Sequence, residues 1–234
     1  MLGRVVLPVR KIAVALPISG MSDAERARRE GYIRGLLPAG VDIDLLISPG
    51  APKFLDQRGH FGDAVQAATE FFATVDSAAY GVVIEAGALD PGLAQLRSVC
   101  PVPVIGPGEA SMYLASIVGL RLSVVTVDEH AVAATEQFLA EVPAKPPIAS
   151  IRSMESPVRG ILDDLESGRQ RLIEECGRAV ADDGAEALYL GSMTLGTLGV
   201  AENLQQALGV PVFNPFPIAV GAAVEVLRAQ SALS

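Results

Sequence analysis

The hydrophobic and polar positions of this 234-residue chain follow two alternating periods. Short apolar runs typical of buried strands alternate with stretches whose apolar residues recur at helical spacing. The predicted strands are 11–16, 41–48, 80–84, 103–105, 122–127, 148–152, 187–190 and 210–213. The first predicted helix begins at residue 22 and the last at about residue 218. The helices predicted between them are 63–75, 92–99, 110–118, 128–141, 157–183 and 200–208. Because helices separate the strands throughout, the pattern predicts parallel sheets with helices on both faces.

Several helix starts have recognisable capping residues. Ser22 and Glu25 have the spacing of a capping box, in which Ser22 accepts a backbone N–H and the Glu25 side chain reaches back. Asp128 is predicted to cap a later helix, and Ser156 followed by Pro157 is predicted to open a long helix that runs to about residue 183. These capping residues place the starts of three helices shortly after the ends of predicted strands.

An internal repeat connects the two halves of the chain. Leu96, Pro103-Val104 and Pro107 recur as Leu204, Pro211-Val212 and Pro215, each 108 residues later. Two related halves are the simplest explanation, although a leucine-containing helix before a Pro-Val strand is common in α/β proteins. Under duplication, the turn after Ile84 corresponds to the turn near Ser192. Both turns follow parallel strands, at the edge where open α/β sheets bind ligands.

The length and net charge of the chain limit its domain organisation and the kinds of partner it can bind. The chain is long enough for one large domain or two small ones, and 18 basic against 27 acidic residues give a net charge of −9. We therefore expect no nucleic acid partner. The apolar runs are far shorter than the roughly 20 residues that cross a bilayer, and the N-terminus lacks a secretory signal. We expect a cytoplasmic protein without a membrane partner, which forms a homo-oligomer.

Cofactor motifs are missing from the sequence. No P-loop, nucleophile elbow or dinucleotide fingerprint occurs, so we expect no nucleotide cofactor. The two histidines, His60 and His130, do not stand at metal-ligand spacing, so we expect no metal. Cys100 and Cys176 are expected to be free thiols, and a disulfide between them is the alternative.

Three sequence positions are candidates for chemistry. The Gly-rich segment 191–196 joins a strand to a helix, so its backbone N–H groups predict a site for a carboxylate or an oxyanion; a tight turn with a purely structural role explains it equally well. Glu85 ends a buried strand, where a carboxylate has a raised pKa or is hydrogen-bonded in a turn. His60 lies in the polar loop 56–61, which could close over a substrate; a solvated loop histidine is the alternative.

Several segments resemble the Asp/Glu/hydantoin racemase superfamily over about residues 10–228. These segments are 82–84 (Val-Val-Ile), 90–93 (Asp-Pro-Gly-Leu), 103–110 (Pro-Val-Ile-Gly-Pro-Gly-Glu-Ala), 190–193 (Leu-Gly-Ser-Met) and 208–212 (Leu-Gly-Val-Pro-Val). The resemblance implies two flavodoxin-like αβα domains related by a pseudo-twofold axis, each with a four-stranded parallel sheet, and a substrate cleft between them. We place the first domain at 1–118 together with the C-terminal helix at 216–234, and the second at 119–215.

The resemblance also implies cofactor-free chemistry in which one thiol from each half moves a proton at the substrate's α-carbon. Aligning on 90–93 places Gly87 at the first thiol's position, aligning on 82–84 places Ala86 there, and Ser192 takes the second position. We therefore expect both catalytic cysteines to be missing and two-thiol racemisation not to operate. The related arylmalonate decarboxylases keep one cysteine and have glycine at the other position, so loss of both departs from that pattern.

The remaining residues predict an anion-binding cleft. By resemblance, Ser19 and Thr126 hold a substrate carboxylate or amide. Gly87, Met193 and Thr194 complete the substrate contacts. We expect a cofactor-independent enzyme that acts on a small carboxylate or cyclic amide through an enolate-like or tetrahedral anion, with Glu85 as base and Ser192 as oxyanion donor or nucleophile. Isomerisation, decarboxylation and hydrolysis all stay open, and a binding protein that kept the cleft without the chemistry is the alternative.

Overall fold

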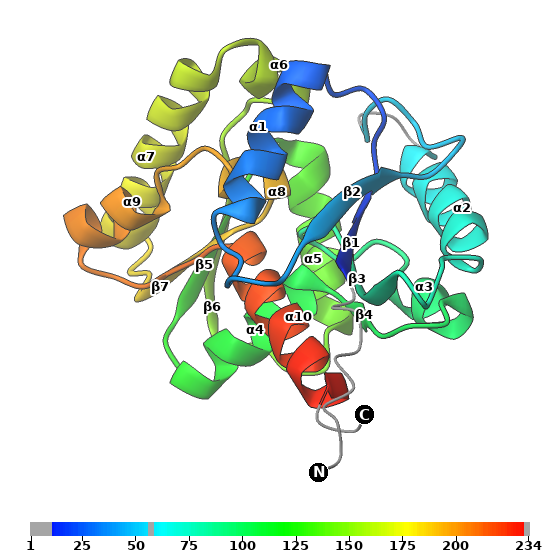
Figure 1. The fold of residues 1–234 in the computed structure, drawn as a ribbon. Coiled ribbons are helices and arrows are strands. Elements are labelled where there is room, and N and C mark those ends of the chain that lie inside the picture. Colours follow the sequence, from blue (N-terminus) through cyan, green and yellow to red (C-terminus); the bar gives the residue numbers. More distant parts are fainter. Residues whose placement is uncertain (1–10, 56–58, 232–234) are drawn as a thin grey trace.

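The computed structural model describes residues 11–55 and 59–231, which form two parallel four-stranded sheets (Figure 1). The first sheet has the strand order β2-β1-β3-β4 and the second β6-β5-β7-β8. The strands are β1 Lys11–Leu16, β2 Ile43–Ile47, β3 Tyr80–Glu85, β4 Val104–Ile105, β5 Leu122–Thr126, β6 Ile148–Ser153, β7 Ala187–Leu190 and β8 Val212–Phe213. The predicted α/β class with two four-stranded parallel sheets is confirmed.

Helices connect the strands, as the sequence pattern predicted. They are α1 Asp23–Arg34, α2 His60–Phe72, α3 Leu93–Val99, α4 Pro107–Val118, α5 Glu129–Glu141, α6 Val158–Asp163, α7 Leu165–Ala181, α8 Met193–Gly196, α9 Ala201–Leu208 and α10 Pro215–Ser231. α4 and α10 both begin on a proline, three residues before the predicted starts, because proline is well tolerated in the first helical turn. Within the described part of the chain, none of the helices combines the length and apolar character that a membrane span requires.

The single long helix predicted over 157–183 is wrong, because the structure divides it into α6 and α7. Asp164 has non-helical angles, φ −142° and ψ 89°, and its carboxylate accepts the Ser167 N–H at 3.0 Å. An aspartate that caps a new helix in this way competes with continuation of the previous one. Pro157 takes the N-cap position of α6 that was predicted for Ser156.

The largest apolar cluster lies between the two sheets. It contains residues of β1 and β3 from the first sheet and of β5 and β7 from the second, together with α4 and α10. Two smaller clusters cover the opposite faces, one against α2 and α3 and one against α7 and α9. The two sheets therefore share one core.

The internal repeat maps onto equivalent elements of the two sheets. Leu96 and Leu204 lie on α3 and α9, Val104 and Val212 in β4 and β8, and each repeat ends on the proline that begins α4 or α10. α10 follows the second sheet in the chain but packs on α4 and β3 of the first half. The placement of the C-terminal helix in the first domain and the domain boundaries stay predictions.

Candidate active site

A cavity of about 440 Å³ opens where the inner strands of both sheets end. Because parallel strands end at the same edge of a sheet, the segments after β1, β3, β5 and β7 converge there. The lining residues from these segments are Pro17, Ile18, Met21, Ala86, Gly87, Ala88, Leu89, Pro91, Val127, Asp128, Gly191, Ser192, Met193 and Thr194. The cavity lies at the edge that the sequence predicted.

Four of the predicted site residues meet in this cavity, namely Gly87, Ser192, Met193 and Thr194. Ser192 is the N-cap of α8, and its Oγ accepts the Thr194 N–H at 3.3 Å. Within the described residues, the Ser192 hydroxyl donates no hydrogen bond to the protein, so its hydrogen is available to an acceptor in the cavity.

Gly87 and Ser192 occupy equivalent positions in the two halves. The N–H of Ala86 donates to the Ala15 carbonyl at 2.8 Å, and the N–H of Gly191 donates to the Val125 carbonyl at 2.8 Å. The next residue in each turn is Gly87 or Ser192, so backbone register pairs Gly87, rather than Ala86, with Ser192. A Cβ on Gly87 would lie 2.4 Å from Cδ of Pro91, so any side chain there requires the 88–91 segment to move.

Glu85 does not line the cavity. The residue is 4% exposed, and its Oε2 accepts the Gly87 N–H at 3.0 Å, so the carboxyl lies behind the cavity wall. Burial, together with the nearby charge of Asp90, raises the pKa of Glu85 well above its usual value. The geometry makes Glu85 a support for the 86–91 wall, and Glu85 is not among the residues that line the cavity.

Two more side chains hold the same wall. Asp90 accepts the Gly108 and Glu109 N–H groups at 2.8 and 2.5 Å at the start of α4, and burial raises its pKa to about 7. The Tyr189 hydroxyl, from β7 in the other half, donates to the Ala88 carbonyl at 2.6 Å. The wall is therefore attached to both halves of the molecule.

Three predicted binding residues lie away from the cavity lining. The exposed Ser19 hydroxyl donates to the Ala51 carbonyl at 2.9 Å, in the loop after β2. Thr126 is fully buried and donates to the Gly191 carbonyl at 3.3 Å, so it supports the Ser192 turn from behind. His60 begins α2 and lines a different cavity.

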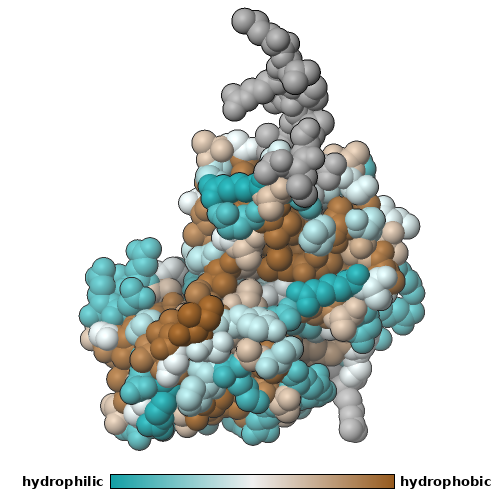
Figure 2. Space-filling model, turned by 90° about the horizontal axis from the view of Figure 1, so that it is seen from below, coloured by the Kyte–Doolittle hydropathy of each residue, from teal (hydrophilic) through white to brown (hydrophobic). Residues whose placement is uncertain are grey.

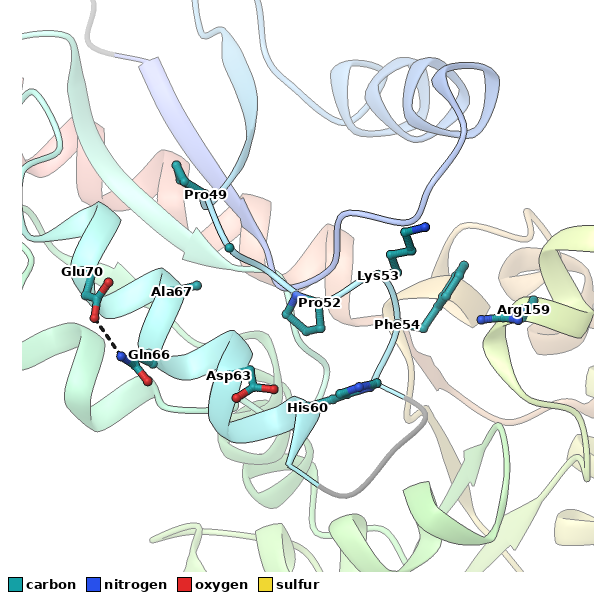
Figure 3. A pocket seen from close by; sticks show the side chains of 11 residues that line it. Pro49, Pro52, Lys53, Phe54, His60, Asp63, Gln66, Ala67, Glu70 and Arg159 are labelled. Carbon is teal, nitrogen blue, oxygen red and sulfur yellow. Dashed lines mark hydrogen bonds between the residues drawn. The ribbon is translucent and has the colours of Figure 1, made fainter.

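That second cavity, of about 530 Å³, lies between the loop after β2 and α2 (Figure 3). The Arg159 guanidinium carbon lies 4.7 Å from the centroid of the Phe54 ring, and both residues line both cavities. Phe54 comes from the first half and Arg159 from α6 of the second, so this cation–π pair forms part of the boundary between the cavities. Residues 56–58 of the predicted loop lie outside the described residues.

Sequence reasoning missed Arg29, which lines the main cavity from α1. The residue is 3% exposed; its Nε donates to Glu25 Oε1 at 2.6 Å and its Nη2 donates to Thr194 Oγ1 at 2.9 Å. The expectation that the Glu25 side chain reaches back to the helix start is wrong, because its carboxylate accepts from Arg28 and Arg29. Burial opposes ionisation of Glu25, but hydrogen bonds from both arginines lower its pKa. The i,i+4 spacing of Glu25 and Arg29 was visible as an ion-pair signal, but it does not show where the pair points.

Neither cysteine lines the cavity, and both are free thiols. Cys176 is buried in α7, where desolvation raises its pKa to about 12. A thiol with that pKa is almost entirely protonated near neutral pH and is a weak nucleophile. In the two described stretches of the chain, no three His, Cys, Asp or Glu side chains are grouped to hold a metal ion.

Comparison with known proteins identifies the family. The sequence model of the Asp/Glu/hydantoin racemase family matches residues 29–223. A hydantoin racemase from Rhizobium meliloti is 34% identical over 145 residues, which are 62% of this chain and 59% of that relative, so the match spans little more than half of the relative's length. Allantoin racemase from Klebsiella pneumoniae has a similar fold, with a TM-score of 0.84 at 24% identity over 94% of this chain and 89% of that one. Unliganded arylmalonate decarboxylase superposes with a TM-score of 0.63 at 18% identity over 93% and 92%. Since the family model covers most of the sequence, the chain belongs to the Asp/Glu/hydantoin racemase family.

Proposed function

We propose that the protein is a cofactor-independent enzyme of this family that binds a small carboxylate or cyclic amide in the main cavity. The observation that carries the proposal is the convergence of Gly87, Ser192 and Thr194 on one cavity at the ends of both sheets. The hydantoin and allantoin racemase relatives favour a cyclic amide and an isomerase reaction. The carbon that reacts would lie between the turn at Gly87 and the turn at Ser192.

The proposed role of Ser192 is to stabilise negative charge on a substrate carbonyl oxygen. Its hydroxyl is oriented by the Thr194 N–H and keeps its hydrogen for an acceptor in the cavity. A donor held in place before the reaction stabilises a developing enolate or tetrahedral anion without reorganisation. Racemisation and decarboxylation both pass through an enolate, and hydrolysis passes through a tetrahedral anion. Because Ser192 could stabilise either anion, an experiment has to decide which reaction occurs.

We further propose that two-thiol proton transfer does not operate in this chain. Gly87 has no side chain and Ser192 has a hydroxyl at the two equivalent turn positions, while neither Cys100 nor Cys176 reaches the cavity. Glu85 is the predicted base, but its carboxyl lies behind Gly87. A base role predicts that E85Q loses kcat and keeps ligand binding, whereas a positioning role predicts a changed KM and stability with kcat retained.

Proton NMR in deuterated water tests the proposal on a panel of hydantoins, amino acids, malonates and small lactams. Deuterium entry at the α-carbon reports isomerase chemistry, loss of carbon dioxide reports a decarboxylase, and ring opening reports a hydrolase. We expect S192A to lower the rate by about 10²- to 10³-fold, the usual effect of removing one oxyanion donor. S98A is the matched control, because it removes an exposed hydroxyl on α3, outside the cavity lining. An S192A rate equal to that of the wild type would contradict the role of Ser192.

A small-molecule binding protein is the second candidate. It is favoured by the absence of both thiols, and of the Glu85 carboxyl, from the cavity lining. It predicts ligand-induced shifts in the protein spectrum without proton exchange, decarboxylation or ring opening in any panel member.

A further inference from the structure

One cation at the main cavity is only partly satisfied by the protein. Arg29 uses Nε on Glu25 and Nη2 on Thr194. Within residues 11–55 and 59–231, Nη1 of Arg29 has no hydrogen-bond partner. It is not one of the completely buried unpaired side-chain atoms, so a ligand can reach it. Because Arg29 is almost completely buried and lines the cavity, the cavity is the direction from which a partner for Nη1 can come.

The charges around Arg29 leave an excess of one positive charge. A single carboxylate, Glu25, accepts from both Arg28 and Arg29. Arg28 directs its other N–H groups to the Thr197 carbonyl and hydroxyl, away from the cavity lining. Burial lowers the pKa of Arg29 and Glu25 opposes that shift, but an arginine stays protonated at neutral pH. An uncompensated buried cation is unfavourable until an anion pairs with it.

The other ionisable groups of the lining do not neutralise this excess. The Asp128 carboxylate, which accepts the Ala131 N–H as the N-cap of α5, is matched in charge by the Arg159 guanidinium at Phe54, and His130 is exposed. The rest of the lining is largely apolar, which strengthens electrostatic attraction inside the cavity.

We propose that Arg29 and Thr194 form a carboxylate subsite inside the cavity, so that the natural ligand carries a carboxylate besides the carbonyl at its reacting centre. This inference rests on the proposed function in taking the main cavity as the ligand site. Thr194 accepts from Arg29 and keeps its own hydroxyl hydrogen to donate, and it is two residues from Ser192. The ligand carboxylate would point to α1 and the reacting carbonyl to Ser192.

The test compares two ligands of the same shape, hydantoin-5-acetate and hydantoin-5-acetamide, by calorimetric titration of the full chain. Charge-assisted hydrogen bonds to a buried arginine are strong, so we expect the carboxylate to bind about 10- to 100-fold more tightly than the amide. In R29M the two ligands should bind within about threefold of each other. R26M is the control: it removes an exposed cation of the same helix, which pairs with Asp23 and lies outside the cavity lining, so the carboxylate preference should persist.

Equal affinities in the wild type, no binding of either ligand, or an unchanged preference in folded R29M would overturn the subsite. If R29M does not fold, a crystal structure of the wild type with hydantoin-5-acetate decides: a carboxylate within hydrogen-bond distance of Arg29 supports the subsite, and a carboxylate elsewhere overturns it. Turnover of neutral hydantoins without a carboxylate preference removes the subsite and leaves the proposed function. A carboxylate preference without proton exchange, loss of carbon dioxide or ring opening leaves the subsite and removes the proposed enzymatic function.

Discussion

At the residue scale, Glu85 and Asp90 couple stability to pH. The pKa of Glu85 is raised by burial and by the Asp90 charge, and burial raises that of Asp90 to about 7 despite two backbone hydrogen bonds and Arg97. The folded state therefore holds these protons more tightly than the unfolded chain, in which carboxyls titrate near 4. Their stabilising contribution is fully present below the unfolded-state pKa and is lost as the pH rises through the folded-state values.

We accordingly expect the free energy of unfolding to fall between pH 5 and pH 8, by at least about 1 kcal/mol, since each displaced proton contributes about 1.4 kcal/mol per pH unit. E85Q keeps an oxygen acceptor for the Gly87 N–H and removes the charge, so it should be more stable than the wild type at pH 8 and show a smaller pH difference. Urea unfolding at both pH values measures this. E70Q, at an exposed site on α2, should behave as the wild type; an E85Q protein with the wild-type pH difference would contradict the account.

At the scale of elements, the turn after β3 is shaped by a close approach that only glycine permits. A Cβ on Gly87 would meet Pro91 Cδ at 2.4 Å, and the proline ring cannot rotate away. We expect G87A to lose about 1 to 3 kcal/mol of stability, the usual cost of overpacking, and to weaken ligand binding because Gly87 lines the cavity.

Gly62→Ala is the matched control for this substitution. A Cβ there meets nothing within 4 Å, and Gly62 lies inside α2, so alanine should be neutral or stabilise the protein by up to about 1 kcal/mol. Thermal unfolding compares the two variants. A G87A protein as stable as G62A would show that the 88–91 segment is not rigid.

The boundaries of the elements show which sequence patterns were sufficient to predict where helices and strands begin and end. β7 begins and ends where predicted, and Ser22 and Asp128 cap α1 and α5 as expected, because strand patterns and caps depend on neighbouring residues. The division between α6 and α7 was missed, because Asp164 fits the polar face of one long amphipathic helix as well as an N-cap. Only the local backbone angles distinguish the two.

At the scale of the whole molecule, contacts between the halves predict that the chain unfolds as one cooperative unit. The central apolar cluster takes residues from both sheets, and the Tyr189 hydroxyl on β7 donates to Ala88 in the wall after β3. We expect a single calorimetric unfolding transition. Y189F leaves a buried carbonyl without its donor, so the whole transition should move down by the equivalent of about 1 to 3 kcal/mol. Two resolved transitions, or a shift of only part of the heat absorption, would show that the halves unfold independently.

The homo-oligomer expected from the sequence stays a prediction, and α4 is where it is tested. Tyr113, Leu114, Ile117 and Val118 expose apolar surface there, with Ile117 81% exposed. Brown, hydrophobic areas are visible on the face of the molecule seen from below (Figure 2). If this surface is buried between copies, I117E should reduce the mass measured by analytical ultracentrifugation, because a buried unpaired charge is costly. An oligomer of unchanged mass in I117E would exclude α4 from the interface.

The order of residues was enough to predict the alternation of strands and helices, the parallel sheets and the relation between the halves, because these depend on local periodicity and on repeated residues. It also indicated the edge at which Gly87 and Ser192 lie. Tertiary structure alone decided that Glu85 turns behind the wall, that Thr126 supports a turn, and that Arg29 reaches the cavity. Periodicity reports which face of an element is buried, but the partner that buries it comes from distant parts of the chain, as when Thr194 of α8 meets Arg29 of α1.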